Sequence, residues 1–379
     1  MILHFSISKS GMPHGVSTVV DMLSQCLPDS DHQFFRAKDK VRSNKNPEVN
    51  NTAVSSNQGY LNYIKKIDFI YVFFMLISSY KIVSSTRKSI MEEDICLAHD
   101  VFCLFWLGIF RYLRVIKKCK LSLYNHSDGH PIETLKQKYK NIALMPLFVL
   151  IEGVINNLNI FTIYSLSDSA SSKVKHILNQ PKYTRFIVVL NYVKGVEISL
   201  SEWENKKQNI WLIGTVCERK GQISFFESIE NLMKDKNYKL TFNILGPCSE
   251  KDQEKLSSFN FVSYLGVHSN VRKLLLPRDI CLSVSSNEGL PMSLLEAASK
   301  ACVIISTDVG GCSEICKDDV NGYLLPYPYI SGEILHKIMQ LIKDDDKHTE
   351  LSQNSLKIFN DRFSEKSAID FWGKESAHF

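Results

Sequence analysis

The chain of 379 residues lacks the features of membrane-spanning and secreted proteins. Its most apolar run, residues 69–78, is too short to cross a bilayer, which takes about 20 residues. A longer apolar stretch, residues 142–164, is interrupted by Glu152 and three asparagines, so we expect no transmembrane helix. Residues 1–7 alternate like a strand and lack the basic start and long apolar core of a signal peptide.

The sequence also lacks metal-binding spacing. Its ten cysteines are scattered, and the one close pair, Cys312 and Cys316, has neither a second pair nor the histidines that a zinc site needs. We therefore expect no metal, and we interpret the cysteines as small apolar core residues of a reducing compartment. These observations predict a cytoplasmic protein.

Charge of neither sign dominates, but its distribution is uneven. The net charge of +5 is the sum of +9 over residues 1–200 (24 Lys+Arg against 15 Asp+Glu) and −4 over residues 201–379 (21 against 25). The basic residues of the first half concentrate between Phe110 and Lys120, interleaved with apolar positions, as in an amphipathic helix leading into a strand. A solvated helix end or a contact with an anionic membrane surface would explain them. Nucleic acid is disfavoured because an aromatic stacking pattern is missing.

A length well above the usual 100–200 residues of one domain predicts two domains. We expect the first over 1–199, the second over 200–355, and a C-terminal helix over 356–379 that packs back on the first. Strand-like and helical stretches alternate in both halves, which predicts an α/β fold with parallel sheets. Residues 36–60 are polar and aperiodic, and we expect a long surface loop there.

The most informative segment runs from residue 280 to residue 326. A strand-like run, residues 281–285, is followed by the loop Asn287-Glu288-Gly289-Leu290-Pro291 and by a helical pattern over 292–300 that contains Glu296. Pro291 suits the first helical position. In a parallel sheet such a loop lies at the carboxyl edge, where helix N-termini bind anions such as phosphate. Glu288 alone could be a capping acid, and Glu296 alone could belong to a buried ion pair.

Two further segments have the same strand–loop–helix form. Residues 211–222 read as a strand, a glycine turn, the basic pair Arg219 and Lys220, and a helix entry. A lysine there is a mobile positive charge suited to a diphosphate, although a solvated basic turn would look the same. Near the N-terminus, the turn that contains Gly11 and Gly15 follows a strand and lacks the three-glycine dinucleotide fingerprint.

Taken in order, Glu288-Gly289-Leu290-Pro291, Glu296-Ala297, Gly310-Gly311, Glu314 and Asn321-Gly322 resemble the donor-site signature of retaining GT-B glycosyltransferases of family 4. The resemblance is gap-free over roughly forty residues, and residues 211–222 add a second matching segment. It implies two Rossmann-like domains facing across a cleft, and a C-terminal helix that crosses back to the N-terminal domain. It also implies sugar transfer from a nucleoside diphosphate, UDP- or GDP-linked, without a cofactor or divalent metal.

The resemblance also implies roles for single residues. Glu296 would bind the ribose, and Glu288 with the backbone of Gly289 and Leu290 would hold the donor sugar. Lys220 would stabilise the departing diphosphate. The family often has an arginine where this chain has Thr215, and Arg219 is a candidate substitute.

In the N-terminal half, the resemblance matches Gly15, and less clearly Gly11, to the glycine that lets the backbone approach the donor phosphates. It matches His126 to a histidine near the donor sugar and acceptor, and His99 to a second histidine at a neighbouring strand end.

The implied function is transfer to a glycan or polyprenyl-pyrophosphate-linked acceptor in bacterial surface polysaccharide synthesis, such as lipopolysaccharide, with a peripheral contact to the inner membrane surface. Two alternatives remain at this stage. A nucleotide-sugar epimerase of the same shape would convert the donor without an acceptor, and a catalytically silent GT-B partner subunit would do neither.

Overall fold

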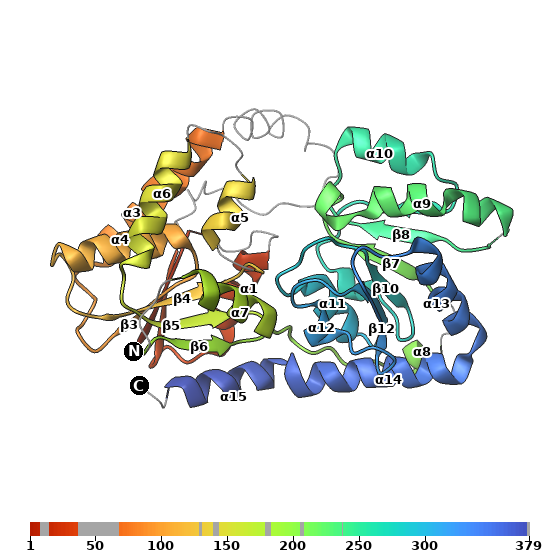
Figure 1. Cartoon of the computed structure of the whole chain (residues 1–379). Coiled ribbons are helices and arrows are strands. Elements are labelled where there is room, and N and C mark those ends of the chain that lie inside the picture. The colour runs from red at the N-terminus through yellow and green to blue at the C-terminus, as the bar shows by residue number, and fades with distance from the viewer. Residues whose placement is uncertain are drawn as a thin grey trace, which may run out of the picture. The chain divides into compact units, whose positions relative to one another are not determined.

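The structure is a computed structural model that describes residues 1–7, 15–36, 68–128, 131–138, 144–178, 183–204, 208–236 and 238–376. The chain divides into two compact units (Figure 1). The first unit contains Met1–Ser165, Ser171–Val188 and Lys374–Phe379, and the second contains Leu166–Ala170 and Val189–Gly373. The division at Val188 falls before the domain boundary that we expected between residues 199 and 200.

The first unit is built on a parallel sheet of six strands in the order β2-β1-β3-β4-β5-β6. The strands are β1 (Ile2–Ser6), β2 (His32–Arg36), β3 (Ile95–Ala98), β4 (Lys120–Asn125), β5 (Ile160–Ser165) and β6 (Arg185–Val188). The described helices along this part of the chain are α1 (Gly15–Cys26), α3 (Asp68–Thr86), α4 (Val101–Tyr112), α5 (Pro131–Lys138), α6 (Met145–Asn156) and α7 (Asp168–Ile177). Every residue of β1 is buried, as expected for a central strand covered on both faces.

The second unit repeats this plan with the strand order β12-β11-β10-β7-β8-β9. Its strands are β7 (Ile210–Ile213), β8 (Phe242–Leu245), β9 (Val262–Tyr264), β10 (Ile280–Ser283), β11 (Val303–Thr307) and β12 (Gly322–Leu325). Its helices include α8 (Leu200–Trp203), α9 (Gln222–Asp235), α10 (Glu250–Ser257), α11 (Met292–Ala298), α12 (Cys312–Ile315), α13 (Ser331–Lys343) and α14 (Asp345–Arg362), with short 3₁₀ turns at Glu218–Lys220 and Val271–Lys273. The α/β prediction with parallel sheets is confirmed.

Each sheet has one point where the strand order reverses. In the first sheet, the chain passes from β1 to β2 on one side and then to β3 on the other. In the second, it passes from β7 outward through β8 and β9 and returns to β10 on the other side of β7. Ligands of such sheets bind outside the carboxyl ends of the strands at this reversal. The loops after β1, β3, β7 and β10 are therefore where functional residues are expected.

Some local predictions were wrong. The amphipathic helix expected across the basic residues ends at Tyr112, and Arg114 has a left-handed backbone with φ of 57° that no helix continues through. Pro291 is the residue before α11 rather than its first helical position. The C-terminal helix expected over 356–379 is divided, in its described part, between the end of α14 and a separate helix α15 (Glu365–Ser376). The loop expected over residues 36–60 lies outside the described residues except for Arg36, which ends β2.

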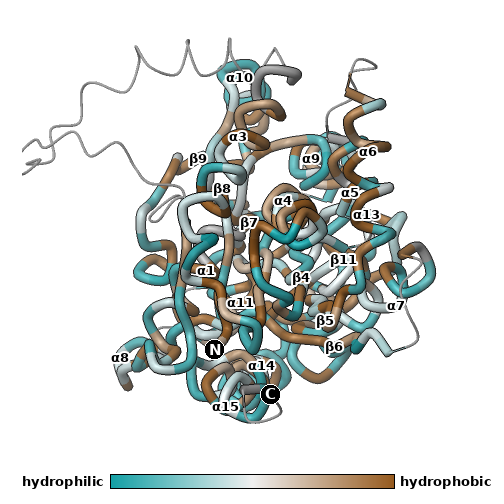
Figure 2. Tube along the Cα trace, turned by 90° about the vertical axis from the view of Figure 1, so that its left-hand side faces the viewer, coloured by the Kyte–Doolittle hydropathy of each residue, from teal (hydrophilic) through white to brown (hydrophobic). Residues whose placement is uncertain are grey.

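Helix α6 is hydrophobic along most of its length, as Figure 2 shows. It buries Phe148, Ile151 and Ile155 in the core of the first unit and exposes Val149 and Leu150. Across the described residues, no helix combines the length and the apolar character needed to cross a bilayer.

The last residues of α15 belong to the first unit through one buried carboxylate. Glu375 is 6% exposed and accepts a hydrogen bond of 2.8 Å from the hydroxyl of Tyr164, which lies on β5. The guanidinium of Arg185 on β6 lies 3.2 Å from the same carboxylate. Two neighbouring strands are thus joined to a segment that lies 211 residues after Tyr164 and 190 residues after Arg185.

Candidate functional site

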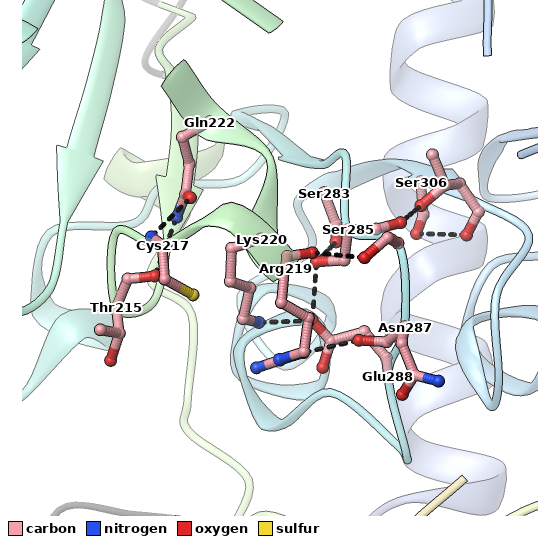
Figure 3. A network of polar contacts seen from close by, with 12 residues as sticks. Thr215, Cys217, Arg219, Lys220, Gln222, Ser283, Ser285, Asn287, Glu288 and Ser306 are labelled. Atoms are coloured by element: carbon pink, nitrogen blue, oxygen red, sulfur yellow. Dashed lines mark hydrogen bonds and ion pairs between the residues drawn. The ribbon is translucent and has the colours of Figure 1, made fainter. Parts of the chain in front are cut away.

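The predicted donor residues of the second unit come together at its strand reversal. Lys220 lies in the turn after β7 and Glu288 in the loop after β10. The ammonium nitrogen of Lys220 is 2.7 Å from Oε1 of Glu288 (Figure 3). The hydroxyl of Ser285 donates to the same oxygen at 2.7 Å. Two segments almost seventy residues apart in sequence therefore meet in one polar cluster.

The residue Glu288 is only 7% exposed. Burial alone would raise the pKa of its carboxyl group, but the charges of Lys220 and Arg219 and the hydrogen bonds from Lys220 and Ser285 outweigh it and lower the pKa below its ordinary value. A buried carboxylate that receives this many donors is held in one orientation. Glu288 is therefore a fixed negative group at the carboxyl edge of the sheet.

Arg219 belongs to the same cluster. Its guanidinium lies 3.1 Å from Glu288 and also donates to the backbone carbonyl of Asn287, while half of its side chain stays exposed. Thr215, where the resembled family often has an arginine, is exposed, and its carbonyl accepts a hydrogen bond from Gln222. Two cationic side chains, those of Arg219 and Lys220, therefore contact the Glu288 carboxylate, although position 215 is not an arginine.

Close backbone approach shapes the loop around Glu288. The amide of Gly311 donates to the carbonyl of Gly289 at 2.7 Å, and a Cβ at Gly311 would lie 2.3 Å from that oxygen. Leu290 is buried, and its carbonyl accepts a hydrogen bond of 3.4 Å from the amide of Asn191. On the other side of the cluster, a Cβ at Gly214 would lie 3.2 Å from Cε of Lys220. Glycines at these positions leave room for the loop and for the lysine.

Glu296 lies on α11 and differs from Glu288. No described residue forms an ion pair or hydrogen bond with its carboxyl group, so the buried ion pair that we considered for it is not found among the described residues. Burial raises the pKa of Glu296, and the positive charge of Arg272 offsets this only in part. A half-buried acid in this state gains free energy from a ligand that donates hydrogen bonds to it.

The remaining predicted residues lie in the first unit. His126 directly follows β4 and is half-buried, and His99 directly follows β3 and is buried. Nδ1 of His99 and Nε2 of His126 are 3.0 Å apart, so the structure brings these two histidines together. Gly15 is the first residue of α1, while Gly11 lies outside the described residues.

The described residues contain no cluster of three or more histidine, cysteine or acidic side chains that could hold a metal ion. The basic groups next to the Glu288 loop are instead lysine and arginine, which bind phosphate directly. The site is thus equipped for an anionic ligand with its own side chains.

Sequence reasoning missed three contributors. Ser285 was interpreted only as the end of a strand, although a serine three positions before an acid at a strand end is a plausible donor to it. His4 on β1 and His32 on β2 were not singled out, yet His4 connects to both His99 and His32 through hydrogen bonds of 3.0 Å. For His4 the signal was a polar residue among the apolar Ile2, Leu3 and Phe5 of β1, whereas β2 also contains Gln33 and Arg36 and gave no such signal for His32.

Comparison with known proteins agrees with this geometry. Residues 197–358, which contain Lys220, Glu288 and Glu296, match the family described as glycosyl transferases group 1. This part of the chain is therefore similar to the glycosyl transferases of group 1. The Asn321-Gly322 turn of this part is structural: the Asn321 side chain bonds the backbone of Ile315 and Lys317, and a Cβ at Gly322 would strike the carbonyl of Ile304.

Curated relatives are similar over part of their length. A *Campylobacter jejuni* N,N'-diacetylbacillosaminyl-diphospho-undecaprenol alpha-1,3-N-acetylgalactosaminyltransferase is 29% identical over 40% of this chain and 41% of its own. The *Bacillus anthracis* N-acetyl-alpha-D-glucosaminyl L-malate synthase is 32% identical over 28% of each chain. A *Staphylococcus aureus* poly(ribitol-phosphate) alpha-N-acetylglucosaminyltransferase is 24% identical over 52% of this chain and 40% of its own. The matches thus span less than half of these relatives.

Solved structures extend the likeness to the whole chain. The *Anabaena* protein HepE in complex with UDP-glucose has a TM-score of 0.68 at 14% identity, covering 100% of this chain and 99% of its own. The sucrose-phosphate synthase of *Thermosynechococcus elongatus* has a TM-score of 0.70 at 12% identity, covering 100% and 98%. At such identities the likeness concerns the fold, and the fold is GT-B, as predicted.

Proposed function

We propose that the protein is a glycosyltransferase that moves a sugar from a nucleoside diphosphate to an acceptor hydroxyl. The observation that carries the proposal is the placement of Lys220, Arg219 and Glu288 at the strand reversal of a unit that is similar to the glycosyl transferases of group 1, next to a Glu296 without a described partner. The cations Lys220 and Arg219 suit the diphosphate of a nucleotide sugar, and the carboxyl groups of Glu288 and Glu296 suit its hydroxyl groups.

The chemistry assigns a role to each group. When the bond between the sugar and the diphosphate breaks, negative charge grows on the diphosphate and positive character on the anomeric carbon. Lys220 and Arg219 would stabilise the first, and fixed groups aimed at developing charge lower the barrier more than groups that must reorient. Glu288 with the Gly289–Leu290 backbone would hold the sugar hydroxyls, and Glu296 would accept hydrogen bonds from the ribose.

The finer features belong to the same proposal. Among the residues that the structure describes at the site, no side chain is a clear covalent nucleophile, which supports same-face attack with retention. Two cations on the diphosphate would make a divalent metal unnecessary. UDP is the first candidate nucleotide because the HepE structures contain UDP or UDP-glucose.

The acceptor is proposed from the relatives. Several of them are named as transferases that act on an undecaprenol-linked sugar or on poly(ribitol-phosphate) or poly(glycerol-phosphate). We therefore propose a glycan or polyprenyl-pyrophosphate-linked acceptor in bacterial surface polysaccharide synthesis, including lipopolysaccharide. We place the reaction in the cytoplasm, at the inner face of the membrane. The free state of the ten cysteines supports a reducing compartment.

A thermal-shift panel tests the donor site first. UDP, GDP, ADP, CMP and NAD are added to the wild type, to Glu296→Ala, and to Glu333→Ala, which changes an exposed acid of α13 in the same unit. A ligand that binds only the folded state raises the melting temperature. We expect one nucleoside diphosphate to stabilise the wild type and Glu333→Ala but not Glu296→Ala. No shift with any ligand would contradict the proposal and favour a silent partner subunit.

Turnover then separates the remaining alternatives. The matching nucleotide sugar is incubated with and without polyprenyl-pyrophosphate-linked glycan, and the products are followed by NMR. Release of nucleoside diphosphate that needs the acceptor supports transfer. Conversion of the donor sugar to an isomer without the acceptor would identify an epimerase instead.

A further inference from the structure

The end of helix α14 is bonded to the short helix α12. Arg362, the last residue of α14, donates from Nη1 to the backbone carbonyl of Glu314 and from Nη2 to its carboxylate, both at 2.7 Å. Glu314 lies in α12, and its side chain is 14% exposed. A guanidinium that makes two bonds to one residue fixes the orientation of that residue as well as its distance. Arg362 thus holds α12 in one position.

Helix α12 depends on such contacts because it is a single turn. It has four residues, and a helix this short is not stable on its own in water. Three side chains donate to the carbonyls at its end, namely Lys317 to Ser313, Arg362 to Glu314 and Asn321 to Ile315. Lys317 and Asn321 lie within six residues of the carbonyls that they bond, whereas Arg362 lies 48 residues away. Of the three contacts, the one from Arg362 anchors α12 to another part of the unit.

The end of α14 is itself firmly held. The helix packs against α11, β11 and β12, and the hydroxyl of Ser352 donates to the carbonyl of Ala301 at 2.6 Å. Directly after Arg362, Phe363 is fully buried, and its carbonyl accepts a hydrogen bond of 2.9 Å from the amide of Val193. The guanidinium of Arg362 therefore extends from a helix end that is fixed on several sides.

Helix α12 is joined in turn to the loop that carries Glu288. Gly311, the residue before α12, donates its amide to the carbonyl of Gly289 at 2.7 Å. The peptide bond between Gly289 and Leu290 is trans, so its N–H points away from its C=O. Because Gly311 fixes this carbonyl, it also fixes the direction of the Leu290 N–H. That N–H donates to no described residue.

The carbonyl of Leu290 is connected to the same end of α14. The side-chain amide of Asn191 donates to it at 3.4 Å, and Val193, two residues later, donates to Phe363. Two routes thus lead from α14 to the Gly289–Leu290 segment, one through α12 and one through residues 191–193. The peptide that presents the Leu290 N–H is held on both sides.

We propose that Arg362 is a positioning residue for the sugar end of the donor. It holds α12 through Glu314 and so keeps Gly311 where it directs the Leu290 N–H at a sugar hydroxyl. The proposal rests on the proposed transferase function, in which the Gly289–Leu290 backbone holds the donor sugar.

The two ends of the donor then respond differently to a change at Arg362. Lys220 and Arg219, the cations proposed for the diphosphate, contact Glu288 directly, and Glu288 is also held by Ser285. None of these contacts passes through α12. Loss of Arg362 removes a restraint on α12 without pushing any atom against the loop. We therefore expect weaker binding of the sugar and unchanged binding of the diphosphate.

Hydrogen exchange of ¹⁵N-glycine-labelled protein, followed by NMR, tests the coupling without any ligand. We expect Arg362→Ala to speed exchange of the Gly311 amide at least about tenfold, because its hydrogen bond opens more often. Lys357→Ala, at an exposed position of the same helix, should leave it unchanged. Gly246, whose amide donates at 2.8 Å in the loop after β8, is the internal reference. Unchanged exchange at Gly311, or equal acceleration at Gly246, would overturn the proposal.

Glu314→Ala supplies a second test should Arg362→Ala not fold. It removes the carboxylate but leaves the backbone carbonyl as an acceptor for Arg362. Faster exchange at Gly311 with unchanged exchange at Gly246 would then support the proposal, and wild-type exchange at Gly311 would refute it.

Isothermal titration calorimetry separates positioning from general support of the fold. The probes are UDP, UDP-glucose and UDP-N-acetylglucosamine, added to the wild type, Arg362→Ala and Lys357→Ala. In Arg362→Ala we expect the Kd of the UDP-sugar that the wild type binds to rise at least about fivefold, and that of UDP to rise less than about twofold. Equal weakening of both would overturn the proposal. If the wild type binds none of the probes, the proposed function with UDP fails, while exchange at Gly311 still tests the coupling.

Discussion

Glu288 and Glu296 lie eight positions apart around one loop–helix junction, yet their carboxyl groups are in opposite electrostatic states. Glu288 accepts from Lys220, Arg219 and Ser285, and its pKa is lowered. Glu296 has no ion pair or hydrogen bond to its carboxyl group among the described residues, and its pKa is raised by burial. The surroundings of Glu288 stabilise its ionised form before any ligand binds. The surroundings of Glu296 destabilise its ionised form.

This difference predicts opposite effects of the same substitution on stability. A lowered folded-state pKa contributes stability above the ordinary pKa, and this contribution is lost as pH falls through the folded value. A raised pKa costs stability above the folded value, and the cost disappears below the ordinary one. At pH 7 we therefore expect Glu288→Gln to lower the free energy of unfolding and Glu296→Gln to increase it, with both differences shrinking toward pH 4.

Urea unfolding of the wild type and both variants at pH 7 and pH 4 measures these differences. Glu333→Gln, at an exposed position, serves as the control and should change little at either pH. A loss of stability in Glu296→Gln at pH 7 would mean that its carboxylate has a partner in solution.

Lys220→Ala should affect both folding and catalysis. Removal of one partner from a buried ion pair costs about 3–5 kcal/mol when the remaining charge is left alone. Because Arg219 and Ser285 still donate to Glu288, we expect the free energy of unfolding, measured with urea, to fall by about 1–3 kcal/mol. Turnover should fall at least about tenfold, since one lost contact to the departing diphosphate typically exceeds 1.4 kcal/mol. Lys343→Ala, an exposed lysine of α13, is the matched control, and equal turnover in the two variants would remove Lys220 from the site.

Arg219 is predicted to supply the second cation for the diphosphate. Arg219→Ala should weaken binding of the nucleoside diphosphate by about tenfold, because a charged hydrogen bond contributes about 1.5–3 kcal/mol. Adding Thr215→Arg to this variant should restore part of the affinity, since Thr215 occupies the family's arginine position. Isothermal titration calorimetry compares the wild type, Arg219→Ala and the double variant. Binding that Arg219→Ala leaves unchanged would show that Lys220 acts without a second cation.

Gly311→Ala should deform the loop that carries Glu288. The new Cβ would lie 2.3 Å from the carbonyl of Gly289 and 3.0 Å from a methyl carbon of Leu290, so the backbone at Gly289 must shift. We expect a melting temperature lowered by several degrees and nucleotide binding reduced at least tenfold. Gly332→Ala is the control, since its nearest neighbour would be 3.8 Å away and α13 gains from alanine. If both variants bind nucleotide equally well, the close approach at Gly311 has no role in the site.

The sequence predicted the second unit better than the first. Lys220 and Glu288 lie in short loops after apolar strands, and Glu296 lies on the helix that follows the second loop, so local pattern was enough to place them at one sheet edge. That Lys220 and Glu288 bond each other could not be predicted, because the distance between two loops depends on strand order. The same holds for His4 and His32, which are separated by a helix and become neighbours only through the register of β1 and β2.

Helix ends were the other source of error. Apolar spacing continues past Tyr112 to Ile116, which suggested a longer helix, but the backbone of Arg114 turns to a positive φ and ends it. A residue other than glycine adopts a positive φ only at a cost in free energy, which the surrounding structure must offset. Sequence spacing carries no information on such a local balance.

The bond between Glu375 and the strands of the first unit also sets an order of events during synthesis. A ribosome makes β5 and β6 early, yet the carboxylate for Tyr164 and Arg185 emerges only after the entire second unit has been translated. Until then the Tyr164 hydroxyl and the Arg185 guanidinium lack this one contact. The nascent first unit therefore gains this contact only after the second unit has been made, and the unit that begins folding first is the last to be completed.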